Sequence, residues 1–390
     1  MKTRVFLTVL ALGTVILACG CTEKATKQPA PAVPAAPGPS QSTEVQPVSA
    51  SPLPQVHTVR VRGSLLVVRH HTKRDALWLV TPASGRARLL YRLPFRAATA
   101  EVSPDRRLVA YLPEPPDSGR WTPGIAVVTA NGSCHRYRLP NADFRFVDAA
   151  SWVSPTLLVL SGRPKAGYED QPLTDRIGFL DVSTGETSAG FPGAEPSAAA
   201  GLLTYATFTD AGSNGQFSGR RQVERLMLRD LSTGSQREIG QGLLEGEYGG
   251  IRYFSHARLS PNGGLLFSCG RGHQAAMGSF ELRILSTGAL LFHYECVGDV
   301  QSAWDDESRH LAFVGLMGNP SNTGPVGVWV YDTQTGILRR SRLRISLVDG
   351  LSFSPAGDLA FANGTVFIAR GGDPRRIVRL MRGDLPVWVR

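Results

Sequence analysis

Histidines and carboxylates are the side chains here that could carry acid–base or metal chemistry, and two short groups stand out. His70 and His71 are adjacent, and Asp305, Asp306 and Glu307 form an acidic triplet. Neighbouring residues on an extended strand point to opposite faces, so the two histidines are poorly placed to share one metal ion. The triplet replaces a turn motif that recurs elsewhere in the chain, which favours a turn over a catalytic pair.

No spacing typical of a known catalytic or cofactor site accompanies these groups. The sequence contains no metalloprotease histidine pair, phosphate-binding glycine loop, nucleophile elbow or paired-cysteine metal site. We therefore expect no catalytic, cofactor-binding or metal-binding residues, and a protein that is not an enzyme. The alternative is a catalytic site assembled from distant parts of the chain.

Three cysteines lie beyond the N-terminal region: Cys134, Cys269 and Cys296. An odd number does not form a complete set of disulfides. A bridge between Cys269 and Cys296 is one alternative. We expect a third strand between the strands that carry them, which favours isolated buried thiols.

The N-terminal residues have the pattern of an export signal. Lys2 and Arg4 place positive charge ahead of an apolar run that extends from Val5 to Ala18, after which the sequence turns polar. The run is shorter than the roughly 20 apolar residues of a spanning helix. Residues 1–18 are therefore predicted to be a signal peptide.

Ile16-Leu17-Ala18-Cys19 resembles the lipobox of bacterial lipoproteins. The resemblance implies that the Cys19 thiol carries a lipid and that the mature chain is extracytoplasmic, anchored to a bacterial membrane. Cys21 satisfies a looser form of the motif, and ordinary secretory cleavage without a lipid is a further alternative.

Residues 19–55 are rich in Pro, Ala, Ser, Gln and Thr and lack a periodic apolar pattern. Such a stretch does not bury enough surface to offset its ordering entropy. We expect a flexible linker that holds residues 56–390 away from the membrane, since proline extends it at up to about 3.1 Å per residue.

Two sequence marks alternate along residues 56–390. One is an apolar strand followed by a polar turn that ends in glycine, at Gly85, Gly132, Gly185, Gly234, Gly288 and Gly336. The other precedes each strand pair, as in the Ser-Pro segments that begin at Val102, Leu259 and Phe353. The marks predict four short strands per repeat, because these segments set turns between β-branched and aromatic runs.

One four-stranded sheet does not cover its own apolar face, whereas radially stacked sheets cover each other. We predict an all-β fold, a β-propeller of about seven four-stranded blades, with six or eight as alternatives. Blade boundaries are expected near residues 98, 144, 194, 245, 298 and 346. The fourth unit departs from the pattern, with Pro196–Ala200 in place of the Ser-Pro motif.

The Ser-Pro-Asp and Asp-x-x-Thr-Gly motifs resemble the WD-like propeller repeats of the TolB C-terminal domain and related bacterial proteins. The resemblance spans most of residues 57–390 and implies the propeller fold. In the last unit, Asn363-Gly364 is a strong hairpin signal. The segment Leu385–Trp388 is expected to close the ring against the first blade near His57–Arg62, with a frayed tail as the alternative.

The connection between the second and third strands is long and polar in blades two to six. In a propeller these connections emerge on one face, and surface loops on a rigid scaffold commonly carry recognition. We predict a partner-binding face there, with insertions tolerated in solvent as the alternative. The candidate residues are Trp121, Tyr168, Phe217, Arg220, Arg221, His273 and Met317.

The formal net charge is +10, and many basic residues gather in blades six, seven and one. Such a basic sector could rest on anionic lipid or a cell-wall polymer, each cation contributing about 1 kcal/mol. A solvated edge without a ligand is the alternative, and nucleic acid is not expected in this compartment. The candidate residues are Arg60, Arg62, Arg69, Lys73, Arg74, Arg339, Arg340, Arg342, Arg344, Arg375, Arg376, Arg379 and Arg382.

These features predict a membrane-tethered, extracytoplasmic binding or scaffold protein that presents a propeller face to another envelope protein. The alternative is a propeller enzyme or receptor for an envelope polysaccharide or another small or polymeric ligand. That alternative predicts carboxylates and histidines that converge on the central channel.

Overall fold

The described part of the chain is antiparallel β-sheet with one turn of 3-10 helix, Arg370–Gly372. A computed structural model describes residues 53–71, 74–114, 124–139, 146–163, 175–212, 221–244, 252–271, 278–297, 301–317, 327–343 and 348–390. All of these residues belong to one compact unit, Pro39–Arg390.

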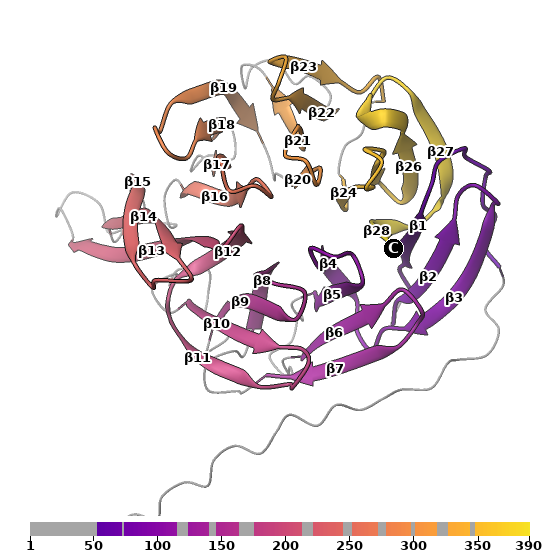
Figure 1. Cartoon of the computed structure of the whole chain (residues 1–390), viewed down its shortest axis with the longest axis horizontal. Coiled ribbons are helices and arrows are strands. Elements are labelled where there is room, and N and C mark those ends of the chain that lie inside the picture. Colours follow the sequence, from indigo (N-terminus) through magenta and orange to yellow (C-terminus); the bar gives the residue numbers. More distant parts are fainter. Residues whose placement is uncertain are drawn as a thin grey trace, which may run out of the picture. The chain divides into compact units, whose positions relative to one another are not determined.

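Seven four-stranded blades form a ring (Figure 1), which confirms the predicted β-propeller and its blade number. In chain order the strands are β1 (Ser64–Arg69), β2 (Ala76–Thr81), β3 (Arg86–Arg92), β4 (Ala97–Val102), β5 (Leu108–Pro113), β6 (Gly124–Thr129), β7 (Cys134–Arg138), β8 (Phe146–Trp152), β9 (Leu157–Arg163), β10 (Arg176–Asp181), β11 (Thr187–Pro192), β12 (Ala194–Ala199), β13 (Leu202–Gly212) and β14 (Arg221–Asp230). They continue with β15 (Gln236–Leu244), β16 (Arg252–Leu259), β17 (Leu265–Arg271), β18 (Gly278–Ile284), β19 (Leu290–Val297), β20 (Ser302–Trp304), β21 (His310–Met317), β22 (Gly327–Asp332), β23 (Ile337–Arg340), β24 (Leu351–Phe353), β25 (Leu359–Ala362), β26 (Thr365–Ala369), β27 (Ile377–Arg382) and β28 (Asp384–Val389).

Each blade takes its strands consecutively, except the first. Blade 1 joins β28 from the end of the chain to β1, β2 and β3. Blades 2 to 7 begin at β4, β8, β12, β16, β20 and β24, which are their inner strands. Blade 4 is a regular blade despite its departure from the Ser-Pro pattern.

The ring closes through β28, as predicted, but β28 pairs with β1 and not with the expected segment His57–Arg62. Leu65 and Leu66 of β1 pair with Trp388 and Val387. The expected partner segment, His57–Arg62, instead packs beside the closure, where the His57 N–H donates to the Leu380 carbonyl at 2.8 Å. β28 pairs with β1 because β1 has a continuous apolar run, Leu65–Val68, which suits a strand buried near the channel.

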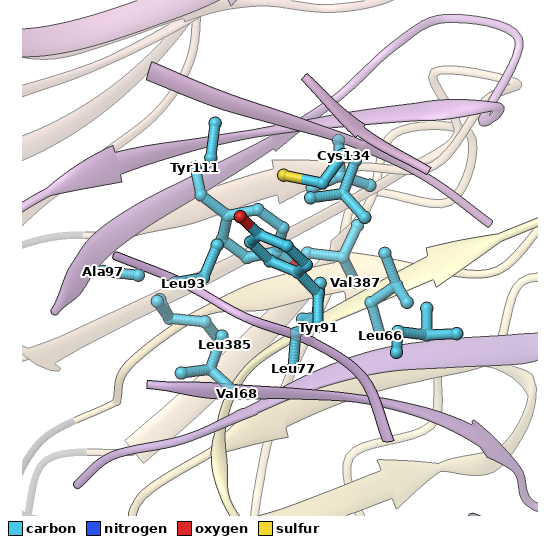
Figure 2. Packing of buried hydrophobic residues seen from close by; sticks show 14 of the residues in the cluster. Leu66, Val68, Leu77, Tyr91, Leu93, Ala97, Tyr111, Cys134, Leu385 and Val387 are labelled. Atoms are coloured by element: carbon cyan, nitrogen blue, oxygen red, sulfur yellow. The ribbon is translucent and has the colours of Figure 1, made fainter. Parts of the chain in front are cut away.

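Adjacent blades bury apolar faces against each other, as Figure 2 shows between blades 1 and 2. Leu66 and Leu77 of blade 1 pack in one cluster with Tyr111 and Cys134 of blade 2. Burial of one such leucine contributes about 1.5–3 kcal/mol, so the stacking of blades supplies the core that one sheet lacks.

Serine hydroxyls tie neighbouring inner strands together. Ser151 Oγ accepts the Ala198 N–H at 3.0 Å, linking blades 3 and 4. Ser197 Oγ accepts the Leu259 N–H at 3.0 Å, linking blades 4 and 5. Ser352 Oγ accepts the Trp388 N–H at 3.1 Å and thereby holds the closing strand to blade 7.

Blades 5 and 6 are joined more closely than the others. Val297 of β19 pairs with Leu316 of β21, so the strands of these two blades form one continuous sheet. Gly315 of β21 lies against the Phe280 ring, and a Cβ there would be 2.1 Å from that ring. Only glycine allows this close approach.

Candidate functional site

The strand ends that flank the predicted recognition loops lie on one face of the propeller. Inner strands begin and second strands end there, as the pairing of Ala97 with Pro113 shows. We call this the loop face, and the opposite face, which carries the Ser-Pro and Thr-Gly turns, the turn face. Five of the predicted recognition residues lie outside the described residues: Trp121, Tyr168, Phe217, Arg220 and His273. Arg221 begins β14 and Met317 ends β21, both at the loop face.

Blade 1 contributes the β1–β2 connection to the loop face. His70 Nδ1 lies 2.9 Å from Asp75 Oδ2, and His70 Nε2 lies 3.8 Å from Asp384 Oδ2. The fully buried Asp75 also accepts the Ala97 N–H at 2.7 Å. The hydrogen bond to Asp75 raises the pKa of His70, although burial opposes it.

Asp384 and Asp349 complete this group at the seam between blades 7 and 1. Asp384 Oδ1 accepts the Gly364 N–H at 2.7 Å, from the predicted Asn-Gly hairpin. Burial raises the pKa of Asp349, and the neighbouring Asp384 carboxylate adds to the effect. His71 joins the group through its backbone N–H, which donates to Asp75 at 3.3 Å. Over the described ranges, no three His, Cys, Asp or Glu side chains are grouped to hold a metal ion.

A cavity of about 660 Å³ occupies the channel between the inner strands. All seven blades contribute to its wall, through their inner strands and the turns that follow them. Small-molecule sites in proteins have volumes of roughly 300–1,000 Å³. The channel is therefore large enough for a small ligand.

Glu101 and Arg258 form an ion pair across this channel. Arg258 Nη2 of blade 5 lies 2.6 Å from Glu101 Oε1 of blade 2. Blades 2 and 5 are three steps apart in a ring of seven, which is the largest separation the ring allows. The Glu101 carbonyl also accepts the Trp152 indole N–H at 2.9 Å, which holds the strand that carries the carboxylate.

A second ion pair crosses the channel at the turn face. Arg106 Nη2 of blade 2 lies 2.5 Å from Asp306 Oδ1 of blade 6, and Arg106 Nε lies 3.1 Å from Asp306 Oδ2. The Arg106 side chain is only 5% exposed. A bidentate contact between guanidinium and carboxylate is the strong form of this interaction.

The repeat pattern contains a signal for Arg106 that sequence reasoning missed. Arg106 has a φ of +60°, and the same turn position is glycine in blades 5 and 7, where Gly263 and Gly357 have φ of +70° and +82°. A non-glycine residue in this region costs about 1 kcal/mol. Its partner Asp306 stands where sister repeats have the proline of Ser-Pro, so both partners depart from the repeat.

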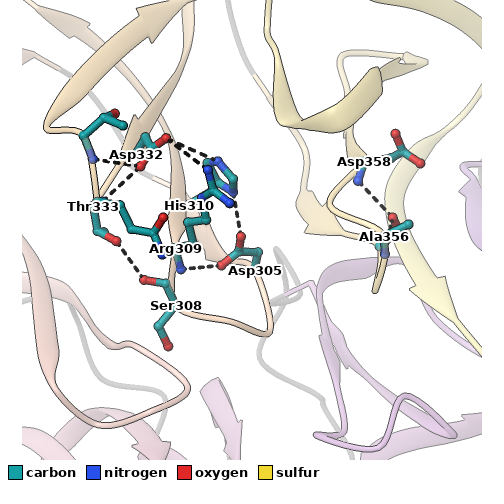
Figure 3. Close-up of polar contacts among 11 residues, drawn as sticks. Asp305, Ser308, Arg309, His310, Asp332, Thr333, Ala356 and Asp358 are labelled. Carbon is teal, nitrogen blue, oxygen red and sulfur yellow. Dashed lines mark hydrogen bonds and ion pairs between the residues drawn. The ribbon is translucent and has the colours of Figure 1, made fainter.

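The acidic triplet forms a turn, as predicted, and its members have different partners. Asp305 Oδ1 accepts the Arg309 N–H at 2.7 Å, and Asp305 Oδ2 lies 2.7 Å from His310 Nδ1. Figure 3 shows His310 between Asp305 and Asp332, whose Oδ2 is 3.9 Å from His310 Nε2. These carboxylates stabilise the turn between strands, while Asp306 points to Arg106.

Cys134 and Cys269 are buried. Burial raises the pKa of the Cys134 thiol to about 11, so it is protonated at neutral pH. The expected third strand is present, since β18 lies between β17, which carries Cys269, and β19, which carries Cys296. Two strand spacings amount to roughly 10 Å, which exceeds the Cα separation of a disulfide.

The described members of the predicted basic sector come from blades 6, 7 and 1, which ring closure makes neighbours. Arg60, Arg62, Arg340, Arg342, Arg375, Arg376 and Arg379 are all exposed. Arg340 stacks over the Trp329 ring at 5.4 Å, and Arg376 Nε lies 3.7 Å from Asp373 Oδ2. Lys73 and Arg344 lie outside the described residues.

No protein-family model and no curated protein matches the chain. Solved structures of low sequence identity do. A protein of unknown function from Desulfotomaculum acetoxidans is 10% identical with a TM-score of 0.50, over 84% of this chain and 99% of that chain. An oligogalacturonate lyase in complex with manganese is 12% identical with a TM-score of 0.48, over 88% of this chain and 96% of that one.

TolB from Acinetobacter baumannii, which the sequence motifs resemble, is also among these structures. It is 15% identical with a TM-score of 0.42, and the match covers 84% of this chain and 66% of TolB. The chain thus spans slightly less than two thirds of the TolB chain. At these identities the likeness extends to the β-propeller fold. No helix within the described ranges is long and apolar enough to cross a membrane.

Proposed function

We propose that this protein is a non-catalytic binding protein of a bacterial cell envelope. In this proposal a lipid on Cys19 tethers the chain to a membrane, and the loop face of the propeller binds a protein partner. The tether follows from the lipobox resemblance and the linker composition described above.

The observation that carries the proposal is the pairing of charges in the channel. Glu101 is neutralised by Arg258 and Asp306 by Arg106, across the full width of the ring. General acid–base chemistry requires a titratable group within reach of the reacting atoms, with its pKa poised for proton transfer. Both channel carboxylates are instead held in ion pairs, which supports a structural role for the channel residues.

The loop face supports the proposal from the other side of the molecule. The long second-to-third connections of blades 2 to 6 contrast with the two-residue hairpin of blade 7. Surface loops held by a rigid scaffold are a common means of recognition. The stacked blades and the interblade serine bonds supply that scaffold.

Site-specific photo-crosslinking in intact cells tests the proposal. A photoreactive residue replaces Glu114, which is exposed at the loop face, or Thr233, which is exposed in a turn of the turn face. We expect a discrete protein adduct from position 114 and none from position 233. Adducts from position 233 alone would contradict binding through the loop face.

The channel cavity favours a second candidate function, a receptor for an envelope saccharide or another small ligand. Its volume of about 660 Å³ is sufficient for such a ligand. This candidate predicts that saccharide fragments of the envelope raise the melting temperature of the purified protein, and that Glu101→Gln removes the effect. Unchanged melting temperatures with all fragments would exclude it.

A further inference from the structure

Arginine is distributed unevenly over the outer strands of the ring. Of the four charged residue types Asp, Glu, Lys and Arg, only arginine occurs on the outer strands of blades 6, 7, 1 and 2, which are β23, β27, β3 and β7. In contrast, β11 of blade 3 carries none of these four types, β15 of blade 4 carries Arg237 beside Glu238, and β19 of blade 5 carries Glu295. The outer rim is therefore basic on four of its seven blades.

Six arginines on the outer strands of blades 7 and 1 and in the segment before β1 are exposed. They form no ion pair or side-chain hydrogen bond with any part of the chain that the structure describes. We call them the seam arginines: Arg60, Arg62, Arg86, Arg88, Arg379 and Arg382. This separates them from Arg225, Arg283 and Arg376, which pair with nearby carboxylates. Uncompensated charge of one sign is the electrostatic condition for attracting an anionic surface.

The chain enters the propeller between the two strands that carry four of these arginines. The His57 N–H donates to the Leu380 carbonyl of β27, and the Val59 N–H donates to the carbonyl of Pro82, the residue that follows β2. Val59 and Val61 are buried between blades 7 and 1. Arg60 and Arg62 alternate with these valines and are exposed, and Figure 1 shows β3 and β27 as the outer strands on either side.

We infer that the propeller docks edge-on against an anionic lipid bilayer through the seam arginines. The inference rests on the proposed location at an envelope membrane. The outer strands form the rim of the ring, so docking through them leaves the channel axis parallel to the bilayer. The loop face then points sideways and stays accessible to a partner.

The tether makes a modest surface affinity sufficient. A chain held by a linker meets the bilayer at a high effective concentration, so docking becomes an intramolecular step. Each cation near an anionic surface contributes about fivefold in affinity. Six unpaired arginines on one edge therefore hold the propeller at the surface, and added salt weakens the contact.

The test uses residues 39–390, which form one compact unit whose apolar cores lie entirely within it. Co-sedimentation measures partition onto vesicles of phosphatidylcholine alone or with 30% phosphatidylglycerol, in about 0.05 and 0.3 M salt. The seam variant is Arg60→Gln, Arg62→Gln, Arg379→Gln, Arg382→Gln. The matched control, Arg107→Gln, Arg225→Gln, Arg237→Gln, Arg283→Gln, removes the same charge from blades 2, 4 and 5.

We expect binding to the anionic vesicles only, lost at the higher salt, and reduced at least tenfold in the seam variant but less than threefold in the control. Equal losses in the two variants would overturn the inference, because net charge alone would then explain binding. Retention by a soluble polyanion without vesicle binding would also overturn it. The assay contains no protein partner, so failure here leaves recognition through the loop face untouched.

Discussion

Arg106 and Asp306 join blades 2 and 6 across the central channel, with Nη2 and Oδ1 2.5 Å apart. The guanidinium is almost fully buried, whereas the carboxylate is 45% exposed. Loss of the carboxylate would therefore leave a buried cation without its counterion, which is the costly way to break a pair.

Asp306→Ala is expected to destabilise the propeller by about 2 kcal/mol, because the buried Arg106 guanidinium then lacks its counterion. The matched control is Glu114→Ala, which removes the partner of the exposed Arg96 and costs less than about 0.5 kcal/mol. Guanidinium unfolding curves at pH 7 measure both. Equal small losses would contradict a cross-channel tie.

Arg106 itself combines an ion pair with an unfavourable backbone conformation. At its φ of +60°, glycine is less strained than alanine by about 1 kcal/mol. We expect Arg106→Gly to be more stable than Arg106→Ala by about that amount, while both are less stable than the parent. The same unfolding curves provide the comparison. A more stable alanine variant would contradict the left-handed backbone conformation of this turn position.

Ser352 links the closing strand to blade 7 through the Trp388 N–H. Ser352→Ala leaves that buried N–H without an acceptor, which costs about 1–3 kcal/mol. Ser232→Ala is the control, because Ser232 belongs to an exposed turn. Hydrogen exchange of β28 is expected to accelerate in the Ser352 variant more than exchange in β13, and equal acceleration would contradict a local role at the closure.

The pKa of His70 is raised by its hydrogen bond to Asp75, so the protonated form is favoured in the folded state. Its contribution is present in full below the unfolded pKa of about 6.5 and is lost as the pH rises through the folded value. We expect His70→Gln to lose more stability at pH 5.5 than at pH 8.5, because the favoured protonated form is present only at the lower pH. A loss independent of pH, measured by unfolding curves, would contradict this assignment.

Cys134 is expected to be unreactive in the folded protein, because burial raises the pKa of its thiol to about 11. Alkylation at pH 8, followed by peptide mass spectrometry, should be at least about 100-fold slower than in the guanidinium-unfolded chain. Figure 2 shows the sulfur enclosed by apolar side chains and tyrosine rings. Equal rates in the two states would indicate that the packing between blades 1 and 2 opens readily.

The repeat marks predicted the blades because each turn has its own local chemistry. Asp181 accepts hydrogen bonds from Ser183, and Gly185 takes a φ of +77°, which local residue types already indicate. The closing strand was also predictable, since its apolar pattern is that of an inner strand. The pairing of this strand with β1 was not predictable, because the neighbouring segment His57–Arg62 also has alternating apolar residues and could have paired with it.

The cross-channel pairs were not predicted because they depend on ring geometry. Glu101 and Arg258 are 157 residues apart in the chain and meet only when seven blades close. A comparison of the repeats with each other contained the signal, since Arg106 replaces a turn glycine and Asp306 a turn proline. The predicted recognition residues lie largely outside the described residues and stay predictions.

The central claim is that the loop face binds a protein partner, and loop shortening tests it most directly. Residues 115–123 and 213–220 are each replaced by Asn-Gly, as in blade 7, and the control inserts Gly-Ser into the turn after Thr233. The dissociation constant for the partner crosslinked at position 114 is measured by calorimetry. We expect a loss of at least 100-fold in a loop-shortened variant and less than twofold in the control. Unchanged affinity in both shortened variants, with intact folding, would contradict the account.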